Sequence, residues 1–272
     1  MPSIRDILKD SSAKLREVAK SPHKEALALL ANSLSKDVIW LMTHDDTIID
    51  LPDDYWENIQ KRENYCPLEY LLNSASFYSR EFYVDSRVLI PRPETEILVD
   101  LAISFSEELK QPTIVEVGTG SGIISIILAL HVESAKIVAA DISGDSLDVA
   151  KLNAEKHGVS DKIEFRKSNI LDDIDENIDI LVSNPPYIPK DEELEKNLSY
   201  EPDTALFGGE VGDEILKRLI DETIKRKIKI LICEMGYNQK DKIENYLKKY
   251  NKKVKFYKDL SGLYRGFSLR EE

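Results

Sequence analysis

The sequence predicts an α/β fold in which helices cover a mostly parallel sheet, preceded by a small bundle of helices. From residue 113 onward, short apolar runs with strand character alternate with helical stretches, which is typical of parallel sheets. Before residue 73, apolar residues recur instead at helical spacing. The chain has 272 residues, 42% of them hydrophobic, so it is long enough to bury a core in one large or two modest domains.

Three regions follow from these patterns. The helical bundle is expected over residues 1–75, and Ser21-Pro22 within it has the form of a helix start, because proline suits the first helical turn. β-Favouring residues on either side of Asp85-Ser86 predict a β-hairpin linker over residues 76–91. Residues 92–272 are then expected to carry the sheet.

The elements of the third region follow one another in a regular order. Pro93-Glu94-Thr95-Glu96 opens a helix that runs through Ile103, because proline and early carboxylates both favour a helix N-terminus. The glycine-rich stretch after residue 117 leads into a second helix, and a third is expected to end near residue 157. The expected strands are residues 113–117, 136–140, 163–166, 178–183, 228–233, 253–257 and 263–269.

The tetrapeptide Asn184-Pro185-Pro186-Tyr187 directly follows one of these strands. Ligands of open α/β sheets bind outside the carboxyl ends of the strands, and the two prolines hold the backbone extended with its carbonyls free. We therefore expect the Asn184 side-chain oxygen and the Pro185 carbonyl to accept the two N–H bonds of a planar NH2 group, with Tyr187 packed along its flat face. The alternative is a simple turn, because Asn and Pro are common turn formers.

A glycine-rich loop, Gly118-Thr119-Gly120-Ser121-Gly122, separates the first strand of the sheet from the next helix. Glycines let the backbone turn sharply against a ligand, and the amides of the helix N-terminus then face that ligand. A dinucleotide site requires glycine at the sixth loop position, where this chain has Ile123. The loop also lacks the Gly-Lys-Ser/Thr of a Walker phosphate loop. A tight strand-to-helix turn without a ligand is the alternative.

Asp141 stands at the end of the next predicted strand, and its carboxylate is suited to accept hydrogen bonds from two ribose hydroxyls. Aspartate at this position is equally an ordinary helix cap. A glycine loop and an acidic strand end together favour an adenosine ligand. Because the loop makes no provision for a pyrophosphate, we expect S-adenosylmethionine rather than NAD.

Between residues 67 and 270 the chain carries a series of motifs: Ile90-Pro91-Arg92-Pro93-Glu94-Thr95-Glu96, the glycine loop, Asp141, the tetrapeptide, Glu201-Pro202 with Ala205-Leu206, and Gly208-Gly209-Glu210. In order and spacing this series resembles the release factor glutamine methyltransferases. The resemblance implies a class I methyltransferase with a Rossmann-like, mostly parallel seven-stranded sheet. It also implies methyl transfer from S-adenosylmethionine to the side-chain nitrogen (N5) of the glutamine in the Gly-Gly-Gln motif of bacterial class I peptide chain release factors, with S-adenosylhomocysteine as the product.

The resemblance assigns roles to single residues. The cofactor is expected to contact Glu116, Gly118, Thr119, Gly120, Ser121, Gly122, Asp141, Asn169, Ile170 and Asn184. The substrate is expected to contact Asn184, Pro185, Pro186, Tyr187, Arg92 and Glu201, of which Asn184, Pro185 and Tyr187 form the catalytic set. A simpler role stays open for three of them: Glu116 bonding to nearby amides, Asn169 forming a turn, and Arg92 acting as a surface charge.

Two regions match the family less closely or less specifically. The helical stretch before residue 67 matches it only in length and character, and is expected to hold the body of a protein substrate or to shield a sheet edge. Where the family usually has glycine, this chain has Leu72-Asn73-Ser74, and we expect the turn to be kept because asparagine tolerates a left-handed conformation.

The long charged stretch at residues 189–210 is expected to cover bound peptide or to be a mobile surface excursion.

Charge and composition argue against several other classes of protein. Lys and Arg number 37 against 50 Asp and Glu, a net charge of −13, so direct binding of nucleic acid is not expected. The four histidines show no metal-ligand spacing, so we expect no metal. No apolar run approaches a membrane span, and the N-terminus lacks a signal-peptide pattern. We expect a monomer of the bacterial cytosol, with Cys66 and Cys233 reduced.

Other methyl acceptors stay open. The exocyclic amine of adenine is also planar and conjugated, so the tetrapeptide by itself does not choose between glutamine and DNA adenine. A DNA N6-adenine methyltransferase is less favoured, because neither a basic surface nor a target-recognition region is evident. A glutamine of a ribosomal protein is the nearer alternative, because both activities share the tetrapeptide. A non-catalytic binding scaffold is disfavoured by the intact Asn184 and Tyr187.

Overall fold

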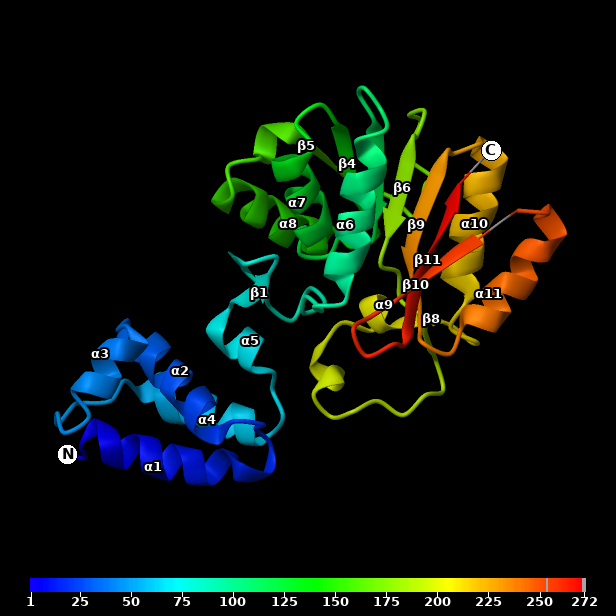
Figure 1. Cartoon of the computed structure of the whole chain (residues 1–272). Helices are drawn as coiled ribbons and strands as arrows, with labels where there is room; N and C mark the ends of the chain where they lie inside the picture. The colour runs from blue at the N-terminus through cyan, green and yellow to red at the C-terminus, as the bar shows by residue number, and fades with distance from the viewer. Residues whose placement is uncertain (253, 271–272) are drawn as a thin grey trace. The chain divides into compact units, whose positions relative to one another are not determined.

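The computed structural model describes residues 1–252 and 254–270, and it divides into two compact units (Figure 1). Residues 1–74 together with 195–200 form the helical unit, and residues 75–194 together with 201–272 form the sheet unit. Each unit buries hydrophobic core residues of its own.

The helical unit is the bundle that the sequence predicts. Its elements are α1 Ile4–Lys14, η1 Leu15–Glu17, α2 Pro22–Leu34, α3 Val38–Thr43, α4 Asp53–Glu63 and α5 Leu68–Leu72. Pro22 opens α2, as expected. In the core, the hydroxyl of the fully buried Tyr55 lies 2.7 Å from Ser11 Oγ. Asn73 follows α5 in the left-handed conformation, with φ +50°, so the turn is kept without a glycine.

The segment 195–200 belongs to the helical unit by its contacts, although its sequence lies between two parts of the sheet unit. It contains the 3-10 helix η3 Leu198–Tyr200. The Tyr200 hydroxyl donates to the Asn64 carbonyl at 2.8 Å, and Lys196 Nζ lies 4.6 Å from the centre of the Tyr65 ring. Part of the stretch at residues 189–210, expected to cover bound peptide or to be a mobile surface excursion, is therefore packed within the helical unit.

The sheet unit contains the predicted seven-stranded sheet, in the order β10-β11-β9-β6-β3-β4-β5. Only β11 among these strands runs antiparallel to its neighbours β9 and β10, while the described pairs from β9 to β5 are parallel. The fold prediction is thus confirmed. The strands are β3 Thr113–Val117, β4 Lys136–Asp141, β5 Ile163–Lys167, β6 Ile180–Ser183, β9 Ile230–Glu234, β10 Val254–Lys258 and β11 Tyr264–Arg270.

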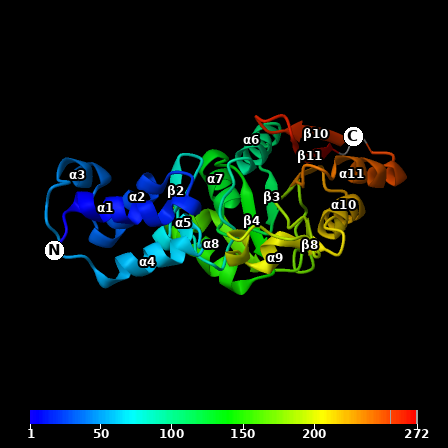
Figure 2. The same cartoon turned by 90° about the horizontal axis from the view of Figure 1, so that it is seen from below.

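Helices cover both faces of this sheet, and alternating side chains of each strand supply a core on either side. Ile180 and Val182 of β6 pack toward one set of helices, whereas Leu181 packs toward the other. Figures 1 and 2 show the two sets on opposite sides of the strands. The first set is α6 Thr95–Ser106, α7 Ile123–His131 and α8 Gly144–Lys156, and the second is α10 Glu214–Arg226 and α11 Lys240–Leu247.

The β-hairpin lies earlier in the chain than the sequence predicts. The paired strands are β1 Ala75–Phe77 and β2 Arg80–Phe82, joined by Tyr78 and Ser79. Both turn residues have positive φ, at +54° and +57°, as in a type I′ turn, whose twist matches that of the flanking strands. Val84 and Val88 lie outside the strands but are buried, so their β-branched side chains serve the core instead. Burial, rather than strand pairing, explains that part of the pattern.

Within residues 1–252 and 254–270, no helix is long and apolar enough to cross a membrane. Over the same residues, no group of three His, Cys, Asp or Glu side chains is placed to hold a metal ion. Cys233 is buried in β9, and burial raises the pKa of its thiol, whereas Cys66 is half-buried.

Candidate active site

A pocket opens at the carboxyl edge of the sheet, inside the sheet unit. It is lined by residues that follow β3, β4, β5 and β6, by the segment before α6, and by the region of α9 Asp203–Leu206 and β8 Phe207–Gly209. Most of the predicted site residues line it: Arg92, Glu116, Gly118, Thr119, Gly120, Ser121, Asp141, Asn169, Ile170, Asn184, Pro185 and Pro186. Gly122, Tyr187 and Glu201 lie outside the lining.

Strand register brings the polar side chains into one row across this edge. Val182 of β6 and Ile232 of β9 are register partners on the face covered by α6. Two residues further along each strand, alternation returns to the same face, which places Asn184 beside Glu234. Val117 of β3 pairs with Ala140 of β4 and with Ser183 of β6. The residue that follows it, Gly118, therefore lies between Asp141 and Asn184. From β4 to β9 the row reads Asp141, Gly118, Asn184 and Glu234.

Glu116 lies on β3 two residues before Gly118 and is nearly fully buried. Its Oε2 accepts hydrogen bonds from the Thr119 hydroxyl at 2.8 Å, from the Ser125 amide at 3.0 Å and from the Ser125 hydroxyl. Its Oε1 is also buried, and it accepts no hydrogen bond from the residues that the structure describes. Burial raises the pKa of this carboxyl group to about 7. The side chain thus both braces the glycine loop, as the simpler interpretation holds, and keeps one oxygen available beside the pocket.

The glycine loop needs its glycines for two different reasons. Gly118 and Gly120 line the pocket with φ of +77° and +52°, so here the backbone itself faces a ligand. Gly122, with φ +84°, instead faces α8, where an added Cβ would lie 3.1 Å from that of Ala150. We find Gly122 in a packing position rather than at the pocket surface.

Asp141 fastens the glycine loop to the end of β4. Its Oδ2 accepts from the Gly120 amide at 2.9 Å, and its Oδ1 accepts from the Ser143 amide at 2.9 Å. Burial raises its pKa, and the backbone hydrogen bonds oppose that shift. A carboxylate has about four lone-pair sites, so both oxygens can still accept from a ligand hydroxyl.

The loop after β5 forms the far wall of the pocket with Ser168, Asn169 and Ile170. Ile170 is left-handed, with φ +60°, an uncommon conformation for a β-branched residue. The Asn169 side-chain oxygen accepts from Arg218 at 3.3 Å.

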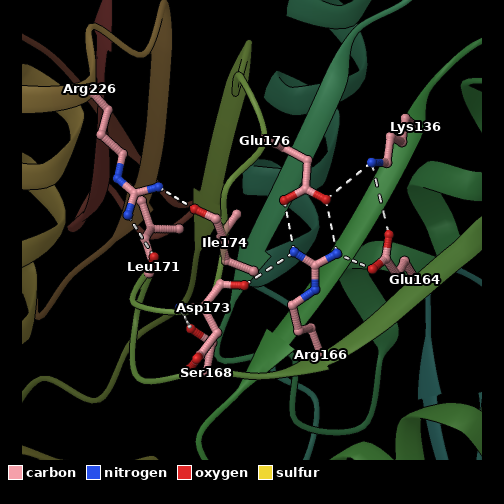
Figure 3. Close-up of polar contacts among 9 residues, drawn as sticks. All are labelled: Lys136, Glu164, Arg166, Ser168, Leu171, Asp173, Ile174, Glu176 and Arg226. Atoms are coloured by element: carbon pink, nitrogen blue, oxygen red, sulfur yellow. Dashed lines mark hydrogen bonds and ion pairs between the residues drawn. The ribbon is translucent and has the colours of Figure 1, made fainter.

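Two arginines hold this loop in place (Figure 3). Arg226 of α10 donates to the carbonyls of Leu171 and Ile174 at 2.7 and 2.5 Å. Arg166 of β5 is paired with Glu176 at 2.8 Å and donates to the Asp173 carbonyl at 3.2 Å. The position of the wall is therefore set by side chains outside the pocket.

Asn184 is half-buried and belongs to a chain of hydrogen bonds. Its Nδ2 donates to Thr95 Oγ1 at 3.2 Å, and Thr95 Oγ1 donates to Glu234 Oε2 at 2.8 Å. Thr95 is the first residue of α6 and also lines the pocket. The side-chain amide of Asn184, which follows β6, is thus held by the first residue of α6.

The rest of the tetrapeptide is fixed by close backbone packing. An added Cβ on Gly208 would lie 2.4 Å from the Pro186 carbonyl oxygen, so only glycine fits behind the prolines. Gln239 is buried and donates to the Tyr187 and Gly212 carbonyls at 3.1 and 3.0 Å. The Tyr187 ring packs against the core on the α10 side, and burial raises the pKa of its hydroxyl.

Arg92 and Glu201, both expected at the substrate, are paired with each other. Arg92 Nη2 lies 2.5 Å from Glu201 Oε1, and Glu201 Oε2 accepts from the Ile90 amide at 3.0 Å. Glu201 is only 4% exposed, whereas Arg92 is partly exposed at the pocket. The pair ties the chain that returns from residues 195–200 to the segment before α6.

Three residues in or near the pocket were not singled out from the sequence: Thr95, which lines it, and Glu234 and Gln239, which do not. Glu234 was missed because the predicted strand stopped at Cys233, although the strand Ile230–Glu234 ends in a carboxylate just as β4 does. Thr95 was noted only as part of a helix start. No sequence signal marks Gln239, whose partners come from distant segments.

Known protein families match two parts of this chain. The family described as PrmC N-terminal domain matches residues 6–72, and the family described as Methyltransferase small domain matches residues 95–200. A release factor glutamine methyltransferase of Dictyoglomus turgidum is 38% identical over 91% of this chain and 90% of its own length. The chain belongs to the release factor glutamine methyltransferase family.

Some other relatives of this chain are longer than it is. A bifunctional methyltransferase of Rickettsia bellii is 34% identical over 89% of this chain, which spans only 50% of that relative. Among solved structures, ribosomal protein L11 methylase from Lactobacillus delbrueckii subsp. bulgaricus is 26% identical over 70% of this chain and 84% of its own, with a TM-score of 0.50. The matches agree with a methyltransferase fold in the sheet unit and confirm the resemblance read from the motifs.

Proposed function

We propose that the protein transfers a methyl group from S-adenosylmethionine to N5 of the glutamine in the Gly-Gly-Gln motif of class I peptide chain release factors. The observation that carries the proposal is the mouth of β6, where Asn184 and Pro185 line a pocket shared with a glycine loop and Asp141. Support for the acceptor comes from family membership and from relatives named for release factor glutamine methylation. The proposal includes a monomeric enzyme of the bacterial cytosol.

The residues around the pocket fit the cofactor. The available Oε1 of Glu116 is an acceptor for the ammonium group of the methionine part, beside a backbone kept open by Gly118 and Gly120. Asp141 is placed for the ribose, and Asn169 with Ile170 for the adenine edge. When bound there, S-adenosylmethionine supplies an electrophilic methyl group.

The chain's own residues hold the acceptor nitrogen. An amide nitrogen is a poor nucleophile because its lone pair is delocalised into the carbonyl. The Asn184 side-chain oxygen and the Pro185 carbonyl accept its two N–H bonds and so aim the lone pair toward the cofactor. Each hydrogen bond contributes about 1 kcal/mol net, whereas a well-held reactive geometry contributes up to about 7–11 kcal/mol. Placement is therefore the larger effect, and water takes the released proton without a strong base.

Other residues support that placement less directly. Tyr187 lies outside the pocket lining, and in this proposal its ring packs along the flat face of the bound glutamine amide. The exposed part of the Arg92 side chain contacts the substrate, while its ion-pair partner Glu201 holds it in position. The helical unit, residues 1–74 with 195–200, holds the body of the release factor, and the sheet unit carries the chemistry.

The test is a methyl-transfer assay with labelled S-adenosylmethionine. The acceptors are a class I release factor, the same factor with the glutamine of its Gly-Gly-Gln motif replaced by alanine, a ribosomal protein carrying a methylatable glutamine, and DNA. We expect label on the unaltered release factor, located on the glutamine by mass spectrometry. Label on the alanine variant or on DNA would refute the proposal. Label on the ribosomal protein alone would show that this protein, and not a release factor, is the methyl acceptor.

A further inference from the structure

Glu234 is a buried carboxylate for which the proposed function has no use. It ends β9 beside Asn184 and is 2% exposed. Burying a charge is costly unless the group is well hydrogen-bonded, and an apolar residue in this row would pack more simply. Its hydrogen bond from the Thr95 hydroxyl links it to the amide at the strand mouth.

The direction of these hydrogen bonds decides which way the amide faces. A hydroxyl carries one hydrogen, and an ionised carboxylate only accepts. The hydrogen of Thr95 therefore points to Glu234, and Thr95 Oγ1 is left as an acceptor toward Asn184. Only the NH2 end of the Asn184 amide satisfies that acceptor, so its oxygen faces the pocket. Oxygen and nitrogen of an amide are otherwise close to interchangeable in shape.

We propose that Glu234 and Thr95 are positioning residues that fix the Asn184 amide with its oxygen toward the acceptor nitrogen. The inference rests on the proposed function, in which that oxygen accepts an N–H bond of the substrate. If Asn184 turned over, its NH2 group would meet the NH2 group of the glutamine, and two donors would face each other. The orientation is set from the α6 side of Asn184, through the hydroxyl of Thr95.

The same linkage makes the orientation depend on pH. Burial raises the pKa of Glu234 to about 7. Below that pKa the carboxyl group carries a hydrogen that it can donate to Thr95, and the Thr95 hydrogen is then free to turn to the Asn184 oxygen. The amide thereby loses its fixed direction, so kcat should rise with pH through this pKa. The groups that influence Glu234 are Arg265 on β11, Arg92 and Glu94 before α6, Tyr187 after β6, Tyr257 on β10 and Cys233 on β9.

The kinetic test compares Thr95→Val with Thr95→Ser at saturating S-adenosylmethionine and release factor. Valine has the shape of threonine without the hydroxyl, so kcat should fall about tenfold or more, equivalent to about 1.4 kcal/mol. Serine keeps the hydroxyl and should restore most of that loss. Thr223→Val is the matched control. Thr223 is buried like Thr95, but its hydroxyl donates to the Leu219 carbonyl within α10 and has no link to Asn184. It should lower Tm comparably and leave kcat unchanged.

A second readout needs no methyl transfer. The side-chain NH2 resonances of Asn184, identified by their loss in Asn184→Ala, should shift between about pH 6 and pH 8 in the wild-type protein, following the titration of Glu234. In Thr95→Val this shift should disappear, while it should persist in Thr223→Val. The rise of kcat over the same pH range should likewise disappear in Thr95→Val and persist in Thr223→Val.

The outcomes separate this inference from the proposed function. If the wild-type protein methylates no release factor, the proposed function fails and the resonances still decide the orientation. If Thr95→Val keeps kcat, or loses affinity for S-adenosylhomocysteine as strongly as it loses kcat, the positioning role is refuted. Asn184 resonances that ignore pH in the wild-type protein would refute it too, and that measurement stands even if Thr95→Val does not fold.

Discussion

Glu116 should make cofactor affinity depend on pH. Its pKa is raised to about 7 by burial, and its Oε1 is expected to accept from the ammonium group of the cofactor, which favours the charged carboxylate. The carboxyl group is neutral below its pKa and charged above it. With a pKa of about 7, the charged fraction rises from roughly 0.03 near pH 5.5 to roughly 0.5 near pH 7, and the cofactor ammonium stays mostly protonated over this interval. The dissociation constant should therefore fall roughly 15-fold over this interval.

Isothermal titration with S-adenosylhomocysteine at several pH values measures this change. Glu116→Gln keeps the shape of the side chain without the charge, so its affinity should be lower near pH 7 and nearly independent of pH. Glu234→Gln is the matched control, because Glu234 has a similarly raised pKa but lies beyond Asn184, away from the cofactor. That variant should keep the pH dependence. A wild-type dissociation constant that stays constant, or a Glu116→Gln variant that follows the wild-type curve, would show that this carboxylate is not the ammonium acceptor.

Three further substitutions test separate parts of the site. Asn184→Ala should lower kcat about 100-fold with little change in the cofactor dissociation constant; equal losses in kinetics and calorimetry would make the cofactor its ligand. Gly208→Ala sets a methyl group against the Pro186 carbonyl, so scanning calorimetry should show Tm lower by roughly 5 °C and kcat reduced. Gly144→Ala, with open space at its Cβ, is the control, and equal Tm values would contradict the packing argument. Arg226→Ala releases two loop carbonyls and should weaken S-adenosylhomocysteine binding roughly tenfold. Lys225→Ala removes a surface pair with Glu222 and should have no such effect; similar weakening in both would count against the role of Arg226.

The limits of prediction are visible at the ends of single strands. The sequence shows the strand before the tetrapeptide because an apolar run ends there at a polar amide followed by two prolines. The same pattern at β9 was read one residue short, since a glutamate after an apolar run looks like the start of a loop. Only the register between β6 and β9 shows that Glu234 stands beside Asn184.

The hairpin illustrates a second limit. β-Branched residues mark positions where a pleated or buried surface is filled, and they do not say which. Val84 and Val88 fill the core, while the paired strands use Phe77 and Phe82 around a turn that carries two left-handed residues. Tyr78-Ser79 is not a typical sequence for such a turn, so local composition pointed elsewhere.

The amino-acid sequence by itself determined the parts of this protein that depend on near neighbours along the chain. These are the alternation of strands and helices, the glycine loop, the extended tetrapeptide and the left-handed turn at Asn73. Tertiary structure decided which distant side chains share a hydrogen bond, as Arg92 does with Glu201 and Thr95 with Glu234. The reason is physical: periodicity and turn chemistry act over a few residues, whereas strand order, register and helix packing are settled only when the whole core is buried at once.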